Sequence, residues 1–404
     1  MPFRTIKKWV FVIEGLNAFA CTYYFNYLLF LLRDQFSFGS FESLLCVAVH
    51  GGVYALASWV GGRFAQRRGY HAALLLGFIG MAAALGAGAW ILGHSEPMPR
   101  MALYGQLGVL MLWTVAMCFT WPTLQALISE GESREGIARQ VGIYNLVWAG
   151  CSAVAYATGG VLFETLGARS LFWLPILLYA VQLVILGFIA KGVRMAHALA
   201  GQVGAAHTPA AHPEAAAFHQ PVKPRTFLTM ARLAIPFAYI AINTLLAVIP
   251  DRARALNLST AEAGAFNSLW FFVRLGAFVL LWRWTGWHYR FRWLLAAFAG
   301  LSISFIVLLT SEQFVLLVVA QVVFGFAAGL IYYSSLFYAM DVGGAKGEHG
   351  GFHESGIGLG ICLGPALGAA TLHFAPSRPD SGAWAVAALL ACAFAALIWL
   401  RVRK

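Results

Sequence analysis

Long apolar stretches separated by short polar breaks run along the whole chain. Each stretch holds about 20 residues, rich in Leu, Ala, Phe and Gly, and shows no alternation of apolar and polar positions. A helix of that length crosses the ~30 Å hydrocarbon core of a bilayer, whereas a barrel strand needs only about 10 residues and alternates. The pattern therefore predicts an all-α membrane protein with twelve transmembrane helices. They are expected at residues 9–31, 41–62, 72–93, 101–128, 137–162, 170–190, 227–249, 261–283, 291–310, 313–340, 351–374 and 382–400.

The composition agrees with this pattern. Of the 404 residues, 60% are hydrophobic and 11% are charged, whereas soluble domains are about 45–50% apolar and about 25% charged. So few charges would not keep that much apolar surface in water, which excludes a soluble enzyme, a disordered chain and a secreted disulfide scaffold. The six cysteines all fall within predicted spans and lack Cys-x-x-Cys spacing. Neither a disulfide framework, a metal site nor a cofactor is therefore expected.

The net charge of +11 needs an explanation in so apolar a chain. Twenty of the 27 Lys and Arg residues fall on one side of the predicted spans and six on the other, and Arg274 falls inside a span. The positive-inside rule then predicts a multi-pass protein of the cell (inner) membrane with both termini in the cytoplasm. Membrane topology thus explains the excess of Lys and Arg over Asp and Glu. The sequence has no polar, basic domain that would suggest a nucleic-acid partner.

One long polar segment, residues 191–225, divides six predicted spans from six. A tetrapeptide that begins at Asn26 and precedes Asp34 recurs 217 positions later, beginning at Asn243 and preceding Asp251. Such internal repetition is typical of transporters built from related halves. The chain is expected to contain a first bundle, a cytoplasmic linker and a second bundle, at residues 1–190, 191–225 and 226–404.

The loop after the second span carries a recognisable motif. Its sequence from Gly62 to Gly69, with Gln66, Arg67 and Arg68, resembles the Gly-x-x-x-Asp-Arg-x-Gly signature of the major facilitator superfamily. That resemblance implies two pseudo-symmetric six-helix bundles that rock about a central site. In the family, the acidic residue helps to hold the halves closed toward the cytoplasm, and with Gln66 in its place that contact would be weaker.

The predicted eleventh span contains small residues at a spacing of four. Such a row lets a neighbouring helix approach closely, and a proline within it permits a bend. We expect this row to serve in helix packing or as a hinge. Its members are Gly356, Gly360, Gly364, Pro365 and Gly368.

Glu14 is the first charged residue inside a predicted span. It shares one helical stripe with Asn17, Cys21 and Tyr24, and a polar stripe on an apolar helix should face a cavity or neighbouring helices. A charge in hydrocarbon costs several kcal/mol, so Glu14 is a functional candidate by default. It either couples transport to protons or serves as a hydrogen-bonded gate or packing residue.

Arg274 lies near the middle of the eighth span, with Asn267 and Trp270 on the same face. It is expected either to pair with a carboxylate of another helix, for which Glu354 is a reasonable partner, or to bind an anionic substrate. Monocarboxylate carriers of the superfamily have an arginine in the eighth span, and Arg274 is similar in place. Trp270, however, stands where those carriers have an aspartate.

His353 and Glu354 are adjacent among glycines at the start of the eleventh span. A histidine beside a carboxylate can relay protons near neutral pH. The alternative is that both are hydrated residues at the end of a loop.

Aromatic, hydroxyl and amide side chains in the spans complete the candidate site. They suit a sugar, a nucleoside or an amphipathic aromatic solute, although helix packing also explains them. His50 is interpreted as a packing histidine. The substrate-binding candidates are Asn17, Tyr24, Asn26, Trp121, Tyr144, Asn145, Asn243, Asn267, Trp270, Arg274, Tyr332 and Tyr333.

Together these features predict a monomeric secondary active transporter in the lipid bilayer that moves a small solute by alternating access and is driven by protons. The sequence contains no Gly-x-x-x-x-Gly-Lys-Ser/Thr loop, so ATP is not expected to drive it. The solute is left open among a sugar or nucleoside, an amphipathic aromatic compound and a small organic anion. The alternative functions are a polytopic membrane enzyme acting on lipid-linked substrates and a non-transporting sensor.

Overall fold

The structure is a computed structural model that describes residues 3–96, 98–130, 132, 134–200, 224–343, 347–378 and 380–403. Within these ranges all regular elements are α-helices. They are α1 (Phe3–Phe36), α2 (Ser40–Arg68), α3 (Tyr70–Gly93), α4 (Pro99–Met117), α5 (Trp121–Ser129), α6 (Arg134–Leu166), α7 (Ser170–Ala200), α8 (Pro224–Ala255), α9 (Thr260–Asn267), α10 (Leu269–Arg283), α11 (Phe291–Thr310), α12 (Phe314–Gly343), α13 (Gly347–Phe374) and α14 (Ser381–Arg403).

Twelve crossings account for these helices. Eleven segments of the described chain are long and apolar enough to span a membrane, and α1 is not among them. With 34 residues, α1 has ample length, but Glu14, Asn17 and Asn26 lower its hydropathy, and all three are buried. The predicted count of twelve thus holds only if α1 is included as a helix whose polar side chains are shielded by its neighbours.

Two of the predicted spans are each broken into two helices. The span predicted at 101–128 consists of α4 and α5, and the span predicted at 261–283 consists of α9 and α10. Pro122, in the first turn of α5, has no backbone N–H and disfavours helical geometry before it. In the intervening turn, the Phe119 and Thr120 amides donate to carbonyls three residues earlier. A proline therefore explains a break that hydropathy alone does not predict.

A buried lysine secures the end of α5. Lys7 is only 4% exposed, and its Nζ donates to the carbonyl oxygens of Ile128 and Glu130 at 2.9 and 3.1 Å. Nζ also lies 2.5 Å from Oε1 of Glu132. A cation at a helix C-terminus interacts favourably with the helix dipole, so this cation has a structural role besides its contribution to topology.

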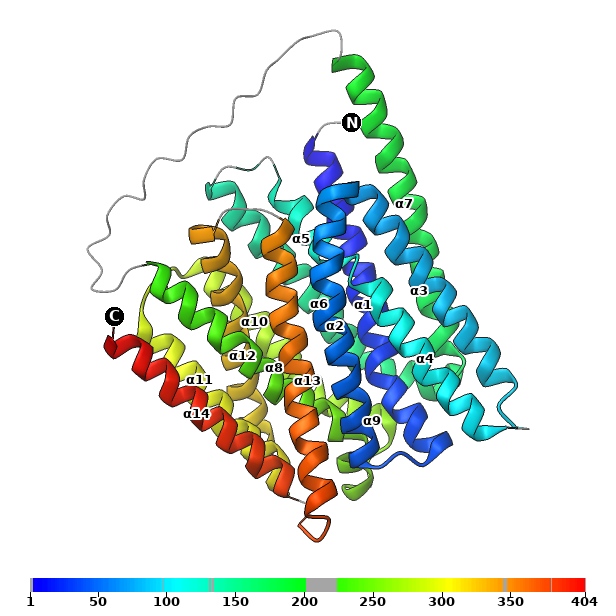
Figure 1. Cartoon of the computed structure of the whole chain (residues 1–404), viewed down its shortest axis with the longest axis vertical. Helices are drawn as coiled ribbons and strands as arrows, with labels where there is room; N and C mark the ends of the chain where they lie inside the picture. Colours follow the sequence, from blue (N-terminus) through cyan, green and yellow to red (C-terminus); the bar gives the residue numbers. More distant parts are fainter. Residues whose placement is uncertain are drawn as a thin grey trace.

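Helices α1–α7 and α8–α14 form two bundles that lie side by side (Figure 1). The bundles meet along α2 with α13 and along α6 with α9 and α10. Glycines permit the first contact: a Cβ on Gly51 would collide with the backbone of Cys362, and one on Gly358 would collide with Ala55. The helices also extend into the predicted linker, because α7 continues to Ala200 and α8 begins at Pro224. The remainder of that linker lies outside the described residues.

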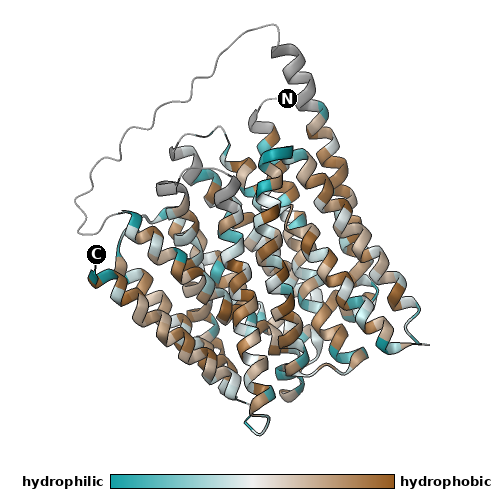
Figure 2. Ribbon diagram, viewed as in Figure 1, coloured by the Kyte–Doolittle hydropathy of each residue, from teal (hydrophilic) through white to brown (hydrophobic). Residues whose placement is uncertain are grey.

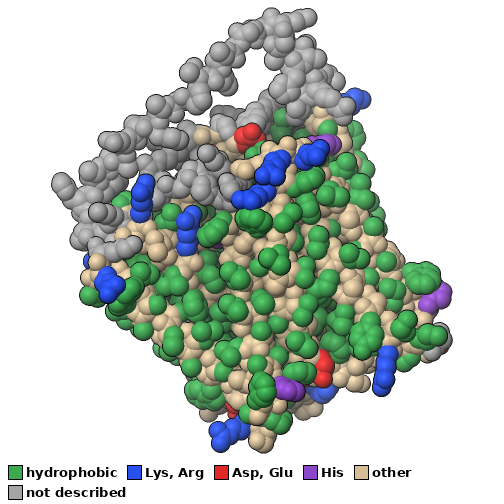
Figure 3. Space-filling view, viewed as in Figure 1, with side chains coloured by type: hydrophobic (Ala, Val, Ile, Leu, Met, Phe, Trp, Pro, Cys, Tyr) green, Lys and Arg blue, Asp and Glu red, His purple; other side chains and the backbone are tan. Residues whose placement is uncertain are grey.

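The surface has the distribution expected of a membrane protein. Apolar residues cover the sides of both bundles, and hydrophilic residues gather toward the helix ends (Figure 2). On the face shown in Figure 3, the blue Lys and Arg side chains also lie near the two ends. An apolar belt between charged ends is suited to a bilayer.

Candidate functional site

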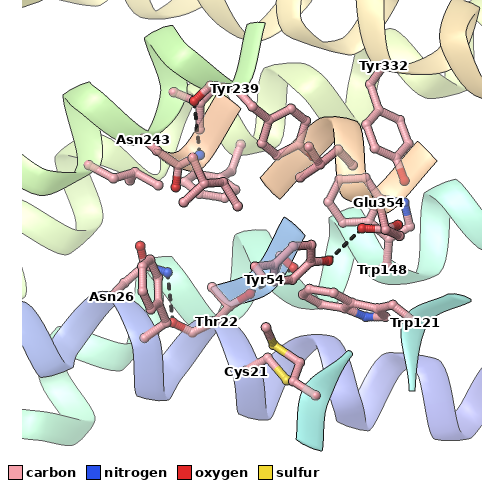
Figure 4. A pocket seen from close by; sticks show the side chains of 18 of the residues that line it. Cys21, Thr22, Asn26, Tyr54, Trp121, Trp148, Tyr239, Asn243, Tyr332 and Glu354 are labelled. Atoms are coloured by element: carbon pink, nitrogen blue, oxygen red, sulfur yellow. Dashed lines mark hydrogen bonds between the residues drawn. The ribbon is translucent and has the colours of Figure 1, made fainter. Parts of the chain in front are cut away.

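A central cavity lies between the two bundles, lined by residues of both. Its volume is about 150 Å³, on a measure by which one water needs roughly 10–15 Å³. It therefore has room for several water molecules or a small solute. Figure 4 shows side chains converging on it from opposite helices.

The cavity includes nine of the predicted site residues. They are Glu14, Asn26, Trp121, Tyr144, Asn243, Trp270, Arg274, Tyr332 and Glu354. All three buried charges considered from the sequence therefore face one space, although they come from α1, α10 and α13.

Arg274 is a buried cation without a carboxylate partner among the described residues. It is 4% exposed, and its guanidinium lies 4.6 Å from the ring centre of Trp148 and 5.0 Å from that of Trp270. Its Nε has no hydrogen-bond partner within the described part of the chain, and the same is true of Trp270 Nε1. Cation–π contacts stabilise a guanidinium, but they leave its N–H donors free for another group.

Glu354 makes its contacts across the interface between the bundles. Its Oε2 accepts a 2.6 Å hydrogen bond from the Tyr54 hydroxyl of α2, and its Oε1 lies 2.5 Å from Nε2 of Gln125 on α5. Of the two alternatives for Arg274, a pairing with Glu354 is therefore not the arrangement in this structure. Both residues lie in the second bundle, but Glu354 is directed toward the first.

Glu14 is fully buried. Neither of its carboxyl oxygens has the geometry of a hydrogen bond with a described residue, although the side chains of Tyr144 and Trp121 lie close enough to interact with the carboxyl group. A buried carboxylate without hydrogen bonds is strongly unfavourable in its charged form. The site can therefore hold Glu14 only with a proton or with a compensating group from the cavity.

Three comparisons with known proteins bear on this arrangement. The sequence profile described as Major Facilitator Superfamily matches residues 2–156. No curated protein matches the chain. Among solved structures, the crystal structure of the human organic anion transporter MFSD10 (TETRAN) aligns with 99% of this chain and 99% of its own, at a TM-score of 0.70 and 15% identity.

The profile match covers residues 2–156, and the likeness to MFSD10 extends over the whole chain, so the chain has a fold similar to that of this transporter. The predicted fold, an all-α membrane protein, is confirmed. In the part of the chain that the structure describes, no group of three or more His, Cys, Asp or Glu residues is arranged to hold a metal ion.

Six predicted site residues do not line the cavity. Asn145 instead accepts a 3.1 Å hydrogen bond from Trp148 Nε1 and so orients the ring beneath Arg274. His353 contacts Ser335 at 3.3 Å and packs edge-on against Tyr332, behind the cavity wall. The others make contacts within their own bundle and are Asn17, Tyr24, Asn267 and Tyr333.

Several cavity residues were not on the list of site candidates. His50 lines the cavity, so its interpretation as a packing histidine is incomplete. Tyr54, Gln125 and Tyr239 also line it. A polar or aromatic residue on an otherwise apolar helix marks each position, but the sequence does not reveal which helix it faces.

The superfamily motif ends α2. Gly69 caps this helix with a φ of 90°, a conformation that favours glycine. Gly62 lies beside Gly351 of α13, on which a Cβ would approach to 3.4 Å. Gln66, Arg67 and Arg68 are exposed.

The glycine row of α13 packs on α8. A Cβ on Gly360 would collide with the Pro236 carbonyl, and one on Gly364 would lie 2.6 Å from the Ile240 carbonyl. Gly356 has a looser contact with α8, and a Cβ on Gly368 would lie 3.2 Å from Leu44 of α2. Helix α13 continues through Pro365 without interruption. The described geometry therefore accounts for the row through packing.

Proposed function

We propose that this protein is a proton-coupled transporter of a small organic anion. The observation that carries this proposal is Arg274, a buried cation that lines the central cavity and forms no ion pair with the described residues. Leaving a buried charge without a partner costs several kcal/mol. An anionic substrate would supply the missing charge when it enters.

The donors around Arg274 suit a carboxylate. Arg274 and Trp270 lie one turn apart on α10 and both line the cavity. Each has an N–H without a hydrogen-bond partner among the described residues, and guanidinium–carboxylate hydrogen bonds are among the strongest in proteins. MFSD10, which shares the fold, is described as an organic anion transporter. These features favour an anion over a neutral sugar or nucleoside.

Glu14 is the proposed coupling residue. A bound anion would neutralise Arg274 and leave Glu14, whose oxygens have no hydrogen-bond partner in the described chain, without a compensating charge. The anion and Arg274 then cancel each other, so a negative charge on Glu14 would be uncompensated and loading favours a proton on this carboxyl. Substrate and proton are therefore expected to cross together in the same direction.

Alternating access requires contacts that can break on either side of the cavity. At one end, Ser40 donates to Asp251 at 2.6 Å and Arg33 donates to the Pro250 carbonyl at 2.9 Å. Toward the other end, Glu354 joins the bundles through Tyr54. We propose that these two sets open in turn and that the segment from Gly62 to Gly69 contributes to closure on the second side.

We further propose a monomer in the cell membrane with both termini in the cytoplasm, as the distribution of cations favours. A sensor of the same fold would bind an anion without moving it. A membrane enzyme would convert its substrate chemically, whereas the cavity groups described above suit binding.

The test is uptake into proteoliposomes with an acidic exterior. Labelled lactate and gluconate are compared with glucose and choline, and protein-free liposomes correct for passive entry. We expect protein-dependent accumulation of a carboxylate that a protonophore abolishes. Carboxylate binding without flux would favour the sensor, and gradient-independent flux would contradict proton coupling.

A further inference from the structure

A chain of hydrogen bonds determines which nitrogen of His50 carries the proton. The Thr114 hydroxyl donates to the Leu110 carbonyl at 2.7 Å, and the same oxygen lies 2.7 Å from Nδ1 of His50. A hydroxyl has one proton to donate, so while Thr114 donates to Leu110, His50 Nδ1–H is the donor in the second bond. In the neutral ring, Nε2 is then an acceptor.

This acceptor is available to a ligand. His50 is 3% exposed and lines the cavity. The contact of the ring with Thr114 uses Nδ1. Its Nε2 makes no hydrogen bond to any described residue. The ring packs against Phe25 in a tilted arrangement with centres 4.4 Å apart, which places it beside the segment of α1 that carries Asn26.

Two asparagines add acceptors of the same kind. The amide nitrogens of Asn26 and Asn243 donate to the carbonyls of Thr22 and Tyr239, at 2.8 and 3.1 Å. Because only a nitrogen can donate to a carbonyl, these bonds identify Oδ1 as the remaining atom of each amide. Asn26 Oδ1 has no partner among the described residues. Figure 4 shows Asn26 and Asn243 toward the same end of the cavity.

The cation lies away from these acceptors. Arg274 lies over Trp148, and Figure 4 shows Trp148 with Glu354 and Tyr332 toward the opposite end. The cavity therefore offers charged donors in one part and neutral acceptors in the other. A ligand that satisfies both needs an anionic group and, at a distance from it, hydrogen-bond donors.

We infer that the substrate is a small carboxylate that bears hydroxyl groups on the part remote from its carboxylate. This inference rests on the proposed function and deepens it. Hydroxyls suit His50, Asn26 and Asn243 because each supplies a neutral acceptor. An ammonium group would instead require a carboxylate nearby. Of the two in the cavity, Glu354 lies at the other end, and Glu14 lies about three turns before Asn26 on α1.

Selectivity follows from the acceptors that an unsuitable ligand would leave unpaired. Sites that hydrogen-bond a substrate hydroxyl discriminate strongly against an analogue that lacks it. A six-carbon carboxylate without hydroxyls would reach Arg274. It would also displace water from His50, Asn26 and Asn243 without replacing the hydrogen bonds that the water makes to them. We therefore expect it to bind at least about tenfold more weakly.

The test compares three six-carbon carboxylates, gluconate, hexanoate and 6-aminohexanoate, by calorimetric titration of the purified full-length protein. Gluconate is expected to bind at least about tenfold more tightly than either of the others. His50→Phe and Asn26→Leu should each reduce this preference, and His50→Gln, which retains an acceptor, should restore part of it. His373→Phe, at an exposed histidine outside the cavity, is the matched control.

Each outcome is decisive. Equal binding of gluconate and hexanoate to the wild-type protein would overturn this inference and leave the proposed anion transport intact. Tighter binding of 6-aminohexanoate would overturn it in favour of a zwitterion. If no carboxylate binds, the proposed function itself fails. The comparison of the three carboxylates on the wild-type protein already tests the inference. The result therefore does not depend on whether a variant folds.

Discussion

The Tyr54 hydroxyl donates a 2.6 Å hydrogen bond to Glu354, from α2 of the first bundle to α13 of the second (Figure 4). The two residues are 300 positions apart in the chain. Gln125 approaches the other oxygen of the same carboxyl. A single side chain of the second bundle thus contacts two helices of the first, and this contact must change if the bundles separate on that side.

Tyr54→Phe removes this hydroxyl and should favour opening on the side of Glu354. One neutral hydrogen bond contributes about 0.5–1.5 kcal/mol, so the open population should rise roughly 2- to 10-fold. Maleimide labelling of Cys21, which lines the cavity, measures this in a variant without the other five cysteines. Tyr23→Phe is the control, because Tyr23 bonds to Ser170 at 2.6 Å within one bundle, and equal effects of both changes would argue against a gating role for Tyr54.

Arg274→Met should abolish carboxylate binding without destabilising the protein. Methionine fills a similar volume and removes a buried charge that has no carboxylate partner among the described residues. We expect at least about a tenfold loss of carboxylate affinity and an unchanged or higher melting temperature without ligand. Arg292→Met, at an exposed cation over Trp293, is the matched control. A marked fall in melting temperature caused by Arg274→Met alone would indicate that Arg274 has a structural partner.

Gly360→Ala should destabilise the contact between α13 and α8. The added methyl group would overlap the Pro236 carbonyl, and such overpacking costs about 1–3 kcal/mol. Gly86→Ala, on α3, adds the same methyl group where no heavy atom lies within 4 Å. Thermal unfolding of the two variants compares them directly. If both melt like the wild-type protein, close packing at Gly360 is not required.

The helices were predictable because their signal is local. About 20 consecutive apolar residues indicate a membrane-spanning helix at any position in the chain. The motif that resembles the superfamily signature directly follows the second span. The break before Trp121 and the early start of α8 depend on backbone geometry near prolines, which hydropathy does not register. The low hydropathy of α1 reflects the same polar side chains that mark it as a functional helix.

The candidate site was predictable only as residue types. A buried Glu14 or Arg274 is conspicuous in an apolar helix, but its partner depends on how distant helices pack. Glu354 was one reasonable partner for Arg274, which shares its bundle, but it bonds to Tyr54 across the interface. The polar residues that share one stripe of α1 also differ in what they contact. Glu14 and Cys21 face the cavity, whereas Asn17 bonds to Thr120 within the first bundle.

His50 shows most clearly that the sequence does not reveal the partners of a buried side chain. Its role as an acceptor follows from Thr114, 64 positions away, and from the bond that Thr114 makes within its own helix. No spacing in the sequence encodes that relationship. Only the packing of α2 against α4 assigns the free nitrogen to the cavity.

The central claim is that one cavity couples an anion to a proton through Glu14, and the pH inside proteoliposomes tests it most directly. A trapped pH-sensitive dye would report the lumen after gluconate, or lactate if gluconate is not transported, is added outside without an imposed gradient. We predict acidification in step with uptake by the wild-type protein. Glu14→Gln should show none while still exchanging labelled for unlabelled substrate, and Glu262→Gln, at an exposed helix start, should behave like the wild-type protein. Uptake that leaves the lumen pH unchanged, or acidification that persists in Glu14→Gln, would contradict the account.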